Sequence, residues 1–302
     1  MKSYYYYPGC SMDASAVTYR KSFEFLRKKL GLNLKEIKDW TCCGSTAAHT
    51  SNEMMALALP ARSIAKAEAM GEDLPIVTPC AACYSRLCYT TEAARKDEAV
   101  RDRIEQIIER PFSAKLDILN FLDLFGDEEV LEKLKDCQTR SLKGLKVACY
   151  YGCLMVRPKG VTGDRIDTED PMIMEKIIEV TGAEAIDWSY KTECCGASHH
   201  VDAPKAARPL VDRIFRNAKA NGADCIVTAC PLCNMNLDMR EEEINKTMGR
   251  EYDMPVFQFT ELLAVAAGAH AADTGVHQHM YPAFDLINRT VSANGRVRRD
   301  GE

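Results

Sequence analysis

Cysteines dominate the chemistry that this sequence can perform. Ten of the fourteen cysteines belong to one pattern that occurs twice: a single cysteine, a vicinal Cys-Cys-Gly and a Cys-x-x-Cys. The members are Cys10, Cys42, Cys43, Cys80 and Cys83 in the first copy, and Cys153, Cys194, Cys195, Cys230 and Cys233 in the second. Five thiols exceed the four that a tetrahedral zinc ion or a cubane iron–sulfur cluster takes from protein. The spacing predicts two metal sites, either multinuclear or zinc, and a chemistry that needs the two sites side by side.

A cysteine count this high would suggest a disulfide framework in a small secreted chain. This chain has 302 residues, which can build a core without covalent staples, and no secretory signal precedes its first apolar segment. A bridge within the vicinal pair Cys42-Cys43 would also be strained. We therefore expect metal-bound thiolates in a reducing compartment, and a cytoplasmic protein.

Charge and hydropathy exclude two further classes. The net charge of −5 disfavours nucleic-acid binding, which needs a basic surface. The longest apolar run near the end, residues 262–269, is far shorter than a membrane span. We expect no nucleic-acid partner and no membrane span of the chain's own.

The cysteine pattern resembles the cysteine-rich CCG domain, and two copies in one chain resemble the B subunit of heterodisulfide reductase. The first copy fits the spacing of that family, with gaps of 31 and 36 residues. The second departs by one residue at each gap, with 40 and 34, which we interpret as a difference in loop length. The resemblance covers residues 1–270.

What the resemblance implies is specific. It implies two noncubane 4Fe-4S clusters on the ten cysteines, and the mixed disulfide of coenzyme M and coenzyme B, from methanogenesis, as the small-molecule substrate. It implies electrons from a ferredoxin-like iron–sulfur subunit of the C type, which a flavin-containing subunit of the A type feeds. Hydrogenase or formate dehydrogenase subunits are further expected members of the complex.

The expected reaction explains why two centres are needed. A disulfide takes two electrons, whereas an iron–sulfur cluster gives one at a time. We hypothesise a symmetric clamp, in which the substrate lies between two centres and each sulfur is captured at one of them. The chain has neither the dense cysteine run of a ferredoxin nor a G-x-G-x-x-G dinucleotide fingerprint, so a partner must supply the electrons.

The repeat extends beyond the cysteines into the segments that must position them. Tyr7-Pro8-Gly9-Cys10 matches Tyr150-Tyr151-Gly152-Cys153, and an Asp-Trp pair precedes both vicinal pairs. Apolar segments such as 3–7 and 146–150 are typical of strands, and they alternate with helical patterns such as 17–30. Alternation along the first strand predicts that two of its four tyrosines lie in the core.

This order of elements predicts an α/β fold with two similar Rossmann-like halves, tandem CCG domains, each a mostly parallel sheet flanked by helices. Sites in such sheets form beyond the carboxyl ends of the strands, where the motif cysteines fall. We predict a first domain at 1–143, a second at 144–270, and a polar C-terminal tail at 271–302.

Other residues near the motifs are candidates for supporting roles. Proton donation to a leaving thiolate would suit a histidine close to a vicinal pair, namely His49, His199 or His200. The anionic ends of the implied substrate would suit a basic side chain near a motif loop, namely Arg157, Lys159, Arg208 or Arg62. We expect the four remaining cysteines, Cys88, Cys137, Cys149 and Cys225, to be structural.

Two alternatives stay open from the residues alone. One is a CCG-type oxidoreductase subunit that acts on another disulfide. The other is a non-catalytic electron-transfer or zinc-stabilised scaffold subunit, which would have no use for the fifth thiol of each set.

Overall fold

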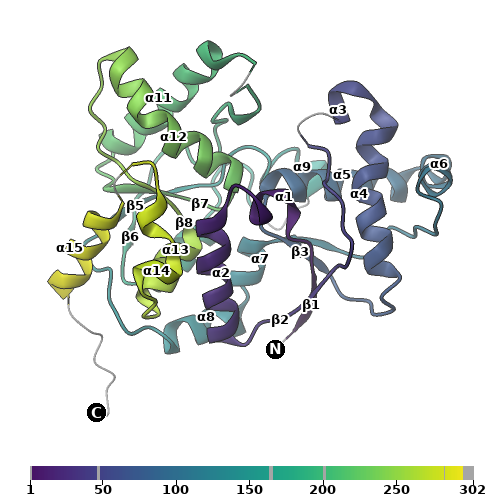
Figure 1. Cartoon of the computed structure of the whole chain (residues 1–302), viewed down its shortest axis with the longest axis horizontal. Helices are drawn as coiled ribbons and strands as arrows, with labels where there is room; N and C mark the ends of the chain where they lie inside the picture. The colour runs from purple at the N-terminus through teal and green to yellow at the C-terminus, as the bar shows by residue number, and fades with distance from the viewer. Residues whose placement is uncertain (1, 46–47, 163–165, 200–201, 282, 295–302) are drawn as a thin grey trace.

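The computed structural model describes residues 2–45, 48–162, 166–199, 202–281 and 283–294. It contains two four-stranded sheets, one in each half, with helices packed around them (Figure 1). The first half is made of β1 (Ser3–Tyr6), α1 (Gly9–Asp13), α2 (Val17–Leu30), β2 (Asn33–Glu36), α3 (Ala48–Ser51), α4 (Glu53–Glu68), β3 (Ile76–Thr78), α5 (Ala81–Lys96), α6 (Glu98–Ile108), β4 (Ile118–Asn120), α7 (Phe121–Phe125) and α8 (Glu128–Asp136).

The second half repeats this order with its own helices and sheet. It is made of β5 (Lys146–Tyr150), α9 (Lys159–Thr162), α10 (Ile173–Glu179), β6 (Glu184–Ala185), the short 3₁₀ helix η1 (Ala197–His199), α11 (Pro204–Ala220), β7 (Cys225–Thr228), α12 (Pro231–Met248), β8 (Val256–Gln258) and α13 (Phe259–Ala266). The segment that follows forms α14 (Ala271–Thr274), the 3₁₀ helix η2 (Val276–Gln278) and α15 (Phe284–Asn294).

The two sheets have the same topology. Their strand orders are β2-β1-β3-β4 and β6-β5-β7-β8, and every strand pair is parallel. In each half the second strand in sequence pairs with one side of the first strand and forms an edge of the sheet. The chain then crosses over, and the third and fourth strands lie on the other side of the first strand. This confirms the predicted α/β class with two similar halves, and it places the carboxyl ends of all strands of a sheet on one rim.

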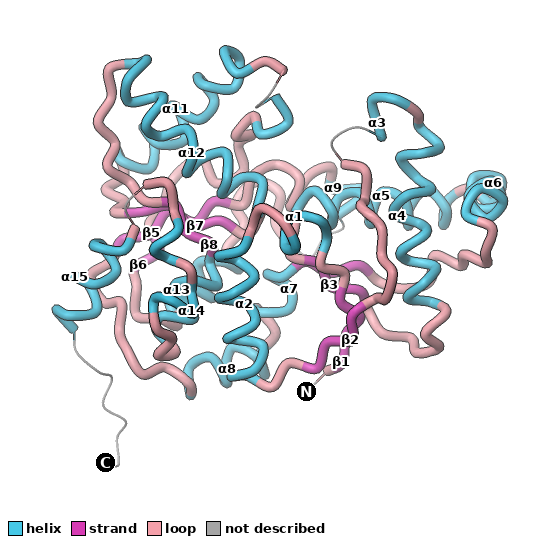
Figure 2. The backbone as a smooth tube through the Cα atoms, viewed as in Figure 1, coloured by secondary structure: helices cyan, strands magenta, loops and turns pink. Residues whose placement is uncertain are grey.

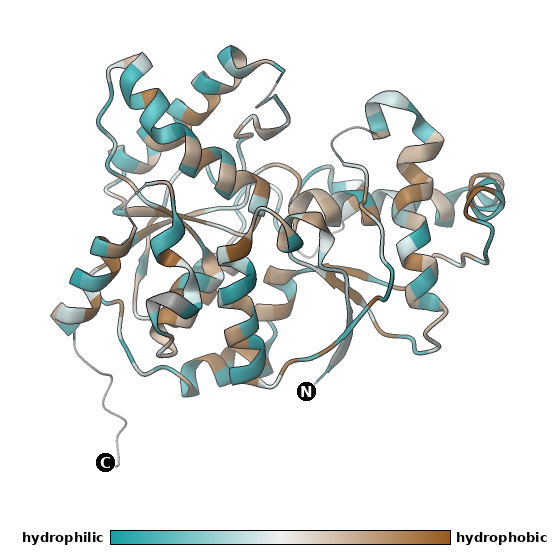
Figure 3. Ribbon diagram, in the orientation of Figure 1, coloured by the Kyte–Doolittle hydropathy of each residue, from teal (hydrophilic) through white to brown (hydrophobic). Residues whose placement is uncertain are grey.

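Helices cover both faces of each sheet, and this decides which strand residues are buried. The prediction that alternation would leave two of the four tyrosines at 4–7 outside the core is wrong, because all four are at most 5% exposed. Parallel strands with helices on both sides bury both sets of side chains. In Figure 3 the buried strand β3 is mostly brown, whereas outward-facing helix surfaces such as those of α11 are largely teal.

One hydrophobic core spans both halves, and a smaller second cluster lies within the second half. α2 of the first half packs against α13 of the second, in the middle of the molecule as Figure 2 shows. Tyr19 on α2 meets Phe259 edge-on, with ring centroids 6.1 Å apart, and Ser22 Oγ lies 2.7 Å from Thr260 Oγ1. Because these residues are buried, the two sheets are fixed relative to each other rather than joined by a linker.

Each half also reaches across to the other near the rim. α1 of the first half contacts α12 of the second, and α9 of the second half contacts α5 of the first. Tyr84 on α5 donates a hydrogen bond to the carbonyl of Thr162 on α9, at 3.0 Å. The two contacts are equivalent. In each, the helix after the first strand of one half (α1 or α9) meets the helix after the third strand of the other half (α12 or α5).

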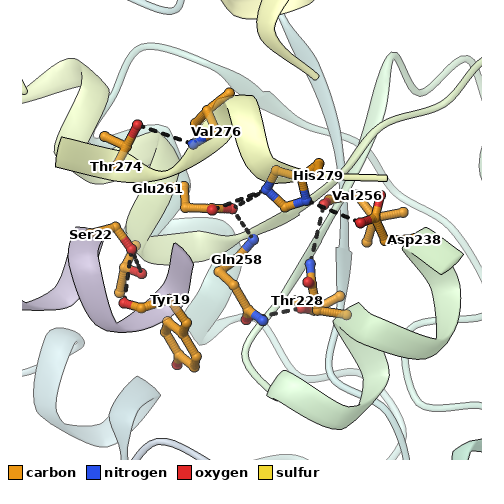
Figure 4. A network of polar contacts seen from close by, with 12 residues as sticks. Tyr19, Ser22, Thr228, Asp238, Val256, Gln258, Glu261, Thr274, Val276 and His279 are labelled. Carbon is orange, nitrogen blue, oxygen red and sulfur yellow. Dashed lines mark hydrogen bonds and ion pairs between the residues drawn. The ribbon is translucent and has the colours of Figure 1, made fainter. Parts of the chain in front are cut away.

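The segment after residue 270 folds back onto the body. His279 lies between Glu261 on α13 and Asp238 on α12, with Nε2 3.0 Å from both carboxylate oxygens of Glu261 (Figure 4). Asp238 also accepts the backbone N–H groups of Met280 and Tyr281. Among the helices that the structure describes, none has the length and apolar character needed to cross a membrane.

Candidate metal centres at the two sheet rims

All ten motif cysteines lie beyond the carboxyl ends of strands. Cys10 lies in the first turn of α1, just after β1, and Cys153 lies at the equivalent place after β5, in a turn. The vicinal pairs lie in the loops that follow the edge strands β2 and β6. Cys80 and Cys230 are the residues immediately before α5 and α12, whose first turns carry Cys83 and Cys233. Each rim therefore gathers one complete set of five.

The sulfur atoms of a set lie close to one another. In the first set, Cys43 Sγ is 3.3 Å from Cys83 Sγ, and Cys42 Sγ is 3.9 Å from Cys10 Sγ. In the second set, equivalent hydrogen bonds join Cys195 to Cys233 and Cys194 to Cys153. The same pairing thus occurs in both halves.

The two sets also touch each other. The side chains of Cys80 and Cys230 form a hydrogen bond across the boundary between the halves. Tyr19, on the helix that joins the halves, lies near both sulfurs and directs its hydroxyl at the carbonyl of Pro79, at 3.5 Å. The two rims therefore form one continuous row of thiols, with exposed members at its ends and buried ones in its centre.

A buried tyrosine holds the loop of each vicinal pair in place through a hydrogen bond to its backbone. Tyr7 donates a hydrogen bond to the carbonyl of Thr41, and Tyr150 donates one to the carbonyl of Glu193, each at 2.6 Å. Thr41 and Glu193 are the residues just before the vicinal pairs. Burial, together with the thiol groups around them, raises the pKa of both tyrosines, so the hydroxyls stay neutral donors. This explains why a tyrosine precedes both Gly-Cys turns.

The two glycines of those turns leave space for a sulfur. Gly9 and Gly152 have positive φ angles of 72° and 69°, a conformation that favours glycine. A Cβ atom added to Gly9 would lie 3.0 Å from Cys83 Sγ, and one added to Gly152 would lie 3.1 Å from Cys233 Sγ. Any larger residue would therefore push against a thiol of its own set.

Contacts between the thiols favour the thiolate form at some positions. Hydrogen bonds from Cys42 and Cys83 lower the pKa of Cys43, and a hydrogen bond from Cys233 lowers the pKa of Cys195. The N–H of Gly44 lies 3.5 Å from Cys42 Sγ, but there the hydrogen bond with Cys43 and burial prevail and raise the pKa. At Cys194, whose pKa the hydrogen bond from Cys153 lowers, the backbone N–H of Gly196 adds to this at 3.3 Å. Such thiolates are the form in which cysteine binds metal.

These residues fit a sulfur-bridged iron cluster better than a single ion. Among the described residues, His, Cys, Asp and Glu side chains nowhere form a group of three or more that could hold one metal ion. The sulfurs instead lie in pairs along each rim, an arrangement that suits several bridged irons. Soft thiolates are also the ligands that such clusters require.

The histidines predicted as proton donors differ in their surroundings. His49 is exposed on α3, and within the described ranges no contact joins it to a motif thiol. His199 is 57% exposed on η1, 3.6 Å from Asp202, and its charge contributes to a lowered pKa of Cys194. His200 lies outside the described residues. His199 is thus the described histidine that has an electrostatic link to a motif cysteine.

The four predicted basic residues have four different environments. Arg157 lies beside the second set, where it donates hydrogen bonds to the carbonyl and hydroxyl of Thr192, at 3.3 and 3.2 Å. Lys159, at the start of α9, is exposed. Arg208 forms an ion pair with Glu243, which balances its charge. Arg62 lines an open groove of about 800 Å³ between α4 and α6.

Sequence reasoning missed two polar groups next to the cysteines. One is the pair Arg86 and Asn236, which occupy equivalent positions one turn after Cys83 and Cys233 and which the repeat itself could have revealed. The other is Lys191, three residues before Cys194, whose side chain is only 4% exposed and pairs with the buried Glu175 at 3.2 Å. A lysine in a loop is usually solvated, so no sequence pattern indicates this one.

The four cysteines outside the pattern are buried, at 9% exposure or less. Cys149 and Cys225 lie inside β5 and β7, as expected, and burial raises the pKa of both thiols. All fourteen cysteines are free, without disulfide bonds.

Comparisons with known proteins agree with this architecture. The CCG family, a cysteine-rich domain, matches residues 4–88 and 147–238. The chain is 30% identical over 94% of its length to the 8-methylmenaquinol:fumarate reductase membrane anchor subunit of Wolinella succinogenes, of which it covers 99%.

Two archaeal relatives have similar identity. One is the B subunit of the ferredoxin/F420H2-dependent CoB-CoM heterodisulfide reductase of Methanosarcina acetivorans, 27% identical over 96% of this chain and 97% of that protein. The other is the B subunit of the ferredoxin:CoB-CoM heterodisulfide reductase of Methanosarcina mazei, 29% identical over 92% of this chain and 94% of that protein.

Among solved structures, a hypothetical protein from Helicobacter pylori superposes with a TM-score of 0.71 at 10% identity. The match covers 93% of this chain and 52% of that one, and it concerns the fold alone. The repeated cysteine set, the two equivalent sheets and the matched ranges lead to one conclusion: the chain belongs to the CCG cysteine-rich domain family and carries the domain twice.

Proposed function

We propose that this chain is the catalytic subunit of a heterodisulfide reductase, which reduces the mixed disulfide of coenzyme M and coenzyme B to two thiols. The observation that carries the proposal is the contact between the two thiol sets at Cys80 and Cys230. Because the two five-thiol sets are in contact, a single substrate molecule could lie next to both sets at once. The relatives named as the B subunits of heterodisulfide reductases support the choice of reaction.

The chain's own residues divide the work. The ten motif cysteines would hold two noncubane 4Fe-4S clusters, which when bound supply electrons one at a time to the sulfur–sulfur bond. Tyr7 and Tyr150 fix the loops of the vicinal pairs, so that the ligand sulfurs keep their positions. The more exposed ends of the row, Cys10 and Cys194, mark the side from which substrate can approach.

Charged groups near the second set suit the anionic ends of that substrate. Arg157 is 39% exposed, donates to Thr192 and lies 3.6 Å from the highly exposed Glu169, and its guanidinium keeps further donors for a sulfonate or a phosphate. Lys159 is exposed two residues further along. Arg208 is a weaker choice, since Glu243 already balances its charge. We assign proton donation to His199, which lies near Cys194.

We further propose that electrons arrive from a ferredoxin-like subunit, which a flavin-containing subunit feeds. The sequence offers no ferredoxin motif of its own and no dinucleotide fingerprint. A complex of this kind would be the functional unit.

A second candidate function is a role in a quinol-linked reductase. The observation that favours it is the relative from Wolinella succinogenes, which matches this chain over nearly its whole length at 30% identity. In that case the two centres would relay electrons between a quinol and a partner subunit, and no disulfide would be broken.

Anaerobic EPR of the purified complex tests the proposal. The oxidised complex is measured with coenzyme M, with coenzyme B, with neither, and with a menaquinol analogue. A paramagnetic signal induced by one thiol, and broadened when its sulfur carries a magnetic isotope, would support disulfide reduction. Reduction by the quinol analogue without any thiol-dependent signal would favour the second candidate and contradict the first.

Metal content separates both candidates from a scaffold. Iron and acid-labile sulfide in about equal amounts, near four per site for clusters of this type, agree with either redox function. Zinc without sulfide would refute both. A Cys42→Ala variant should lose one centre, whereas Cys137→Ala, outside the motif, should keep the metal content of the parent chain.

A further inference from the structure

The two halves place different residues at one equivalent position beside the thiols. Arg86 follows Cys83 by three residues on α5, and Asn236 follows Cys233 by three residues on α12. Residues three apart lie on the same face of a helix. Both side chains therefore start from the face that carries the last cysteine of their set.

In the second half this position is neutral and its hydrogen bond is made. Asn236 is fully buried, and its Nδ2 donates to the carbonyl of Cys195 at 2.8 Å. The bond ties α12 to the second vicinal pair. It also shows that a side chain at this position of the helix is long enough to reach the second cysteine of the vicinal pair.

In the first half the same position carries a full positive charge. Arg86 is half-buried, and its guanidinium carbon lies 5.2 Å from the centre of the Tyr89 ring. Within the part of the chain that the structure describes, the guanidinium makes no hydrogen bond or ion pair. Hydrogen bonds from Cys42 and Cys83 are the main causes of the lowered pKa of Cys43, the counterpart of Cys195, and the charge of Arg86 acts in the same direction.

The described charges near the second set differ from Arg86, because each is paired with an opposite charge or exposed to solvent. Lys191 is only 4% exposed, but Glu175 and Asp170 balance its charge. The charges that act on Cys194 are those of His199 and Glu193, which have opposite effects. His199 is 57% exposed, so solvent screens it, and Arg157 points to Thr192 and Glu169. A half-buried arginine acts through a lower dielectric and is felt more strongly.

A positive charge beside an iron–sulfur centre favours the reduced state, because reduction adds negative charge. We propose that Arg86 makes the two centres inequivalent, so that the centre on the first cysteine set is reduced before the centre on the second. This rests on the proposed function only in requiring that each set holds a redox-active cluster. Arg86 is then a tuning residue, which acts on the centre without being one of its ligands.

The experiment is an anaerobic redox titration of the holoprotein, followed by EPR. Cys43→Ala and Cys195→Ala, which each remove one centre, assign the two midpoint potentials. In Arg86→Gln, the potential of the first centre should become more negative while that of the second stays unchanged, and the two should move closer together. Arg86→Lys, which keeps the charge, should restore most of the difference.

A matched control removes the same charge elsewhere. Arg101 lies on α6 in an exposed pair with Glu98, so Arg101→Gln should leave both potentials unchanged. Unchanged potentials in Arg86→Gln would overturn the inference, and so would equal shifts of both centres. A change in substrate affinity alone would also overturn it, since Arg86 would then be an anion-binding residue. Absence of iron and sulfide in the parent chain would refute the proposed function itself.

Discussion

Cys80 and Cys230 share a hydrogen bond across the boundary between the two halves, although they lie far apart in the sequence. Each is the last residue before the helix that carries the second cysteine of its Cys-x-x-Cys. The contact exists because the same strand–turn–helix unit occurs twice, and the two units face each other beside α2 and α13. Each half would therefore bring an equivalent metal centre to the contact between Cys80 and Cys230.

This contact predicts that inner and outer ligands behave differently on substitution. Cys80→Ala should disturb the EPR signals of both centres, because its sulfur touches the other set. Cys10→Ala, at the exposed end of the row, should disturb only the first centre. The measurement is EPR of the reduced holoprotein with iron content. Equal effects of the two substitutions on the second centre would contradict the arrangement.

Tyr7 and Tyr150, which hold the loops of the vicinal pairs, should each be needed for the centre of its own half alone. Tyr7→Phe removes the hydrogen bond to the Thr41 carbonyl, and Tyr150→Phe removes the one to Glu193. We expect each to lower the free energy of unfolding by about 1 kcal/mol, the typical value of such a bond. Denaturant unfolding of the metal-free chain measures this.

Cluster loading then tests specificity. Tyr7→Phe should weaken the first centre and leave the second intact, and Tyr150→Phe should do the reverse. Tyr89→Phe, an exposed position on α5, is the control and should change neither.

The glycine before Cys10 should tolerate no side chain. Gly9→Ala forces a residue with a Cβ into a positive φ, at a cost of about 1–2 kcal/mol, and places that carbon 3.0 Å from Cys83 Sγ. We expect loss of the first centre by iron analysis. Gly71→Ala also has a positive φ but has no atom within 4 Å of the added carbon, so it should cost backbone strain alone. Full loading of Gly9→Ala would show that the turn has another role.

Much of this architecture was predictable from sequence, for a physical reason. Strands that are buried on both faces are apolar throughout, so β1, β5 and β7 stand out. Cysteines at their carboxyl ends must then share a rim. The edge strands β2 and β6 escaped prediction because β2 is polar and β6 has only two residues. Their pairing depends on neighbours far along the chain.

The polar groups around the thiols were harder to predict. Arg86 and Asn236 differ in type, and only the equivalence of α5 and α12 in the fold relates them. The C-terminal segment is polar in composition, yet His279 docks it through charges on α12 and α13 that the sequence does not pair. Long-range ion pairs of this kind depend on the completed fold.

The buried ion pair behind the second set should hold its loops together. Lys191 Nζ lies 3.2 Å from Glu175 and 2.7 Å from Asp170, and Tyr151 donates its hydroxyl to Glu175. The carbonyl of Lys191 accepts the N–H groups of Tyr151 and Gly152, just before Cys153. This network links the Cys153 turn to the loop of the second vicinal pair.

Removing one partner of this pair should be worse than removing both. Lys191→Met leaves the buried carboxylate of Glu175 without its ammonium partner, and we expect a loss of about 3 kcal/mol in the free energy of unfolding. The double variant Lys191→Met with Glu175→Leu should lose less, because no charge remains buried. Denaturant unfolding of the parent chain, of Lys191→Met, of Glu175→Leu and of the double variant gives the coupling energy. Additive losses would mean that the two side chains do not interact.

His279 should make stability depend on pH above neutrality. Burial opposes its charge, but the carboxylates of Glu261 and Asp238 prevail and raise its pKa from 6.5 to about 10. A pKa that is higher in the folded state contributes stability that is fully present below pH 6.5 and is lost as pH rises through about 10. The slope should approach about 1.4 kcal/mol per pH unit between these values.

Comparison with His279→Gln isolates this contribution from other groups that titrate. Glu241, whose pKa burial raises to about 7, titrates at the lower end of the window and faces Asp238 and Asp253. It is present in both proteins, as are the cysteines and lysines, so the difference between the two unfolding curves belongs chiefly to His279. We expect that difference to shrink from pH 6.5 to 10, and limited proteolysis should show the segment after residue 270 becoming accessible over the same range. A difference that stays constant with pH would mean that His279 is neutral in the folded protein and docks the segment by packing alone.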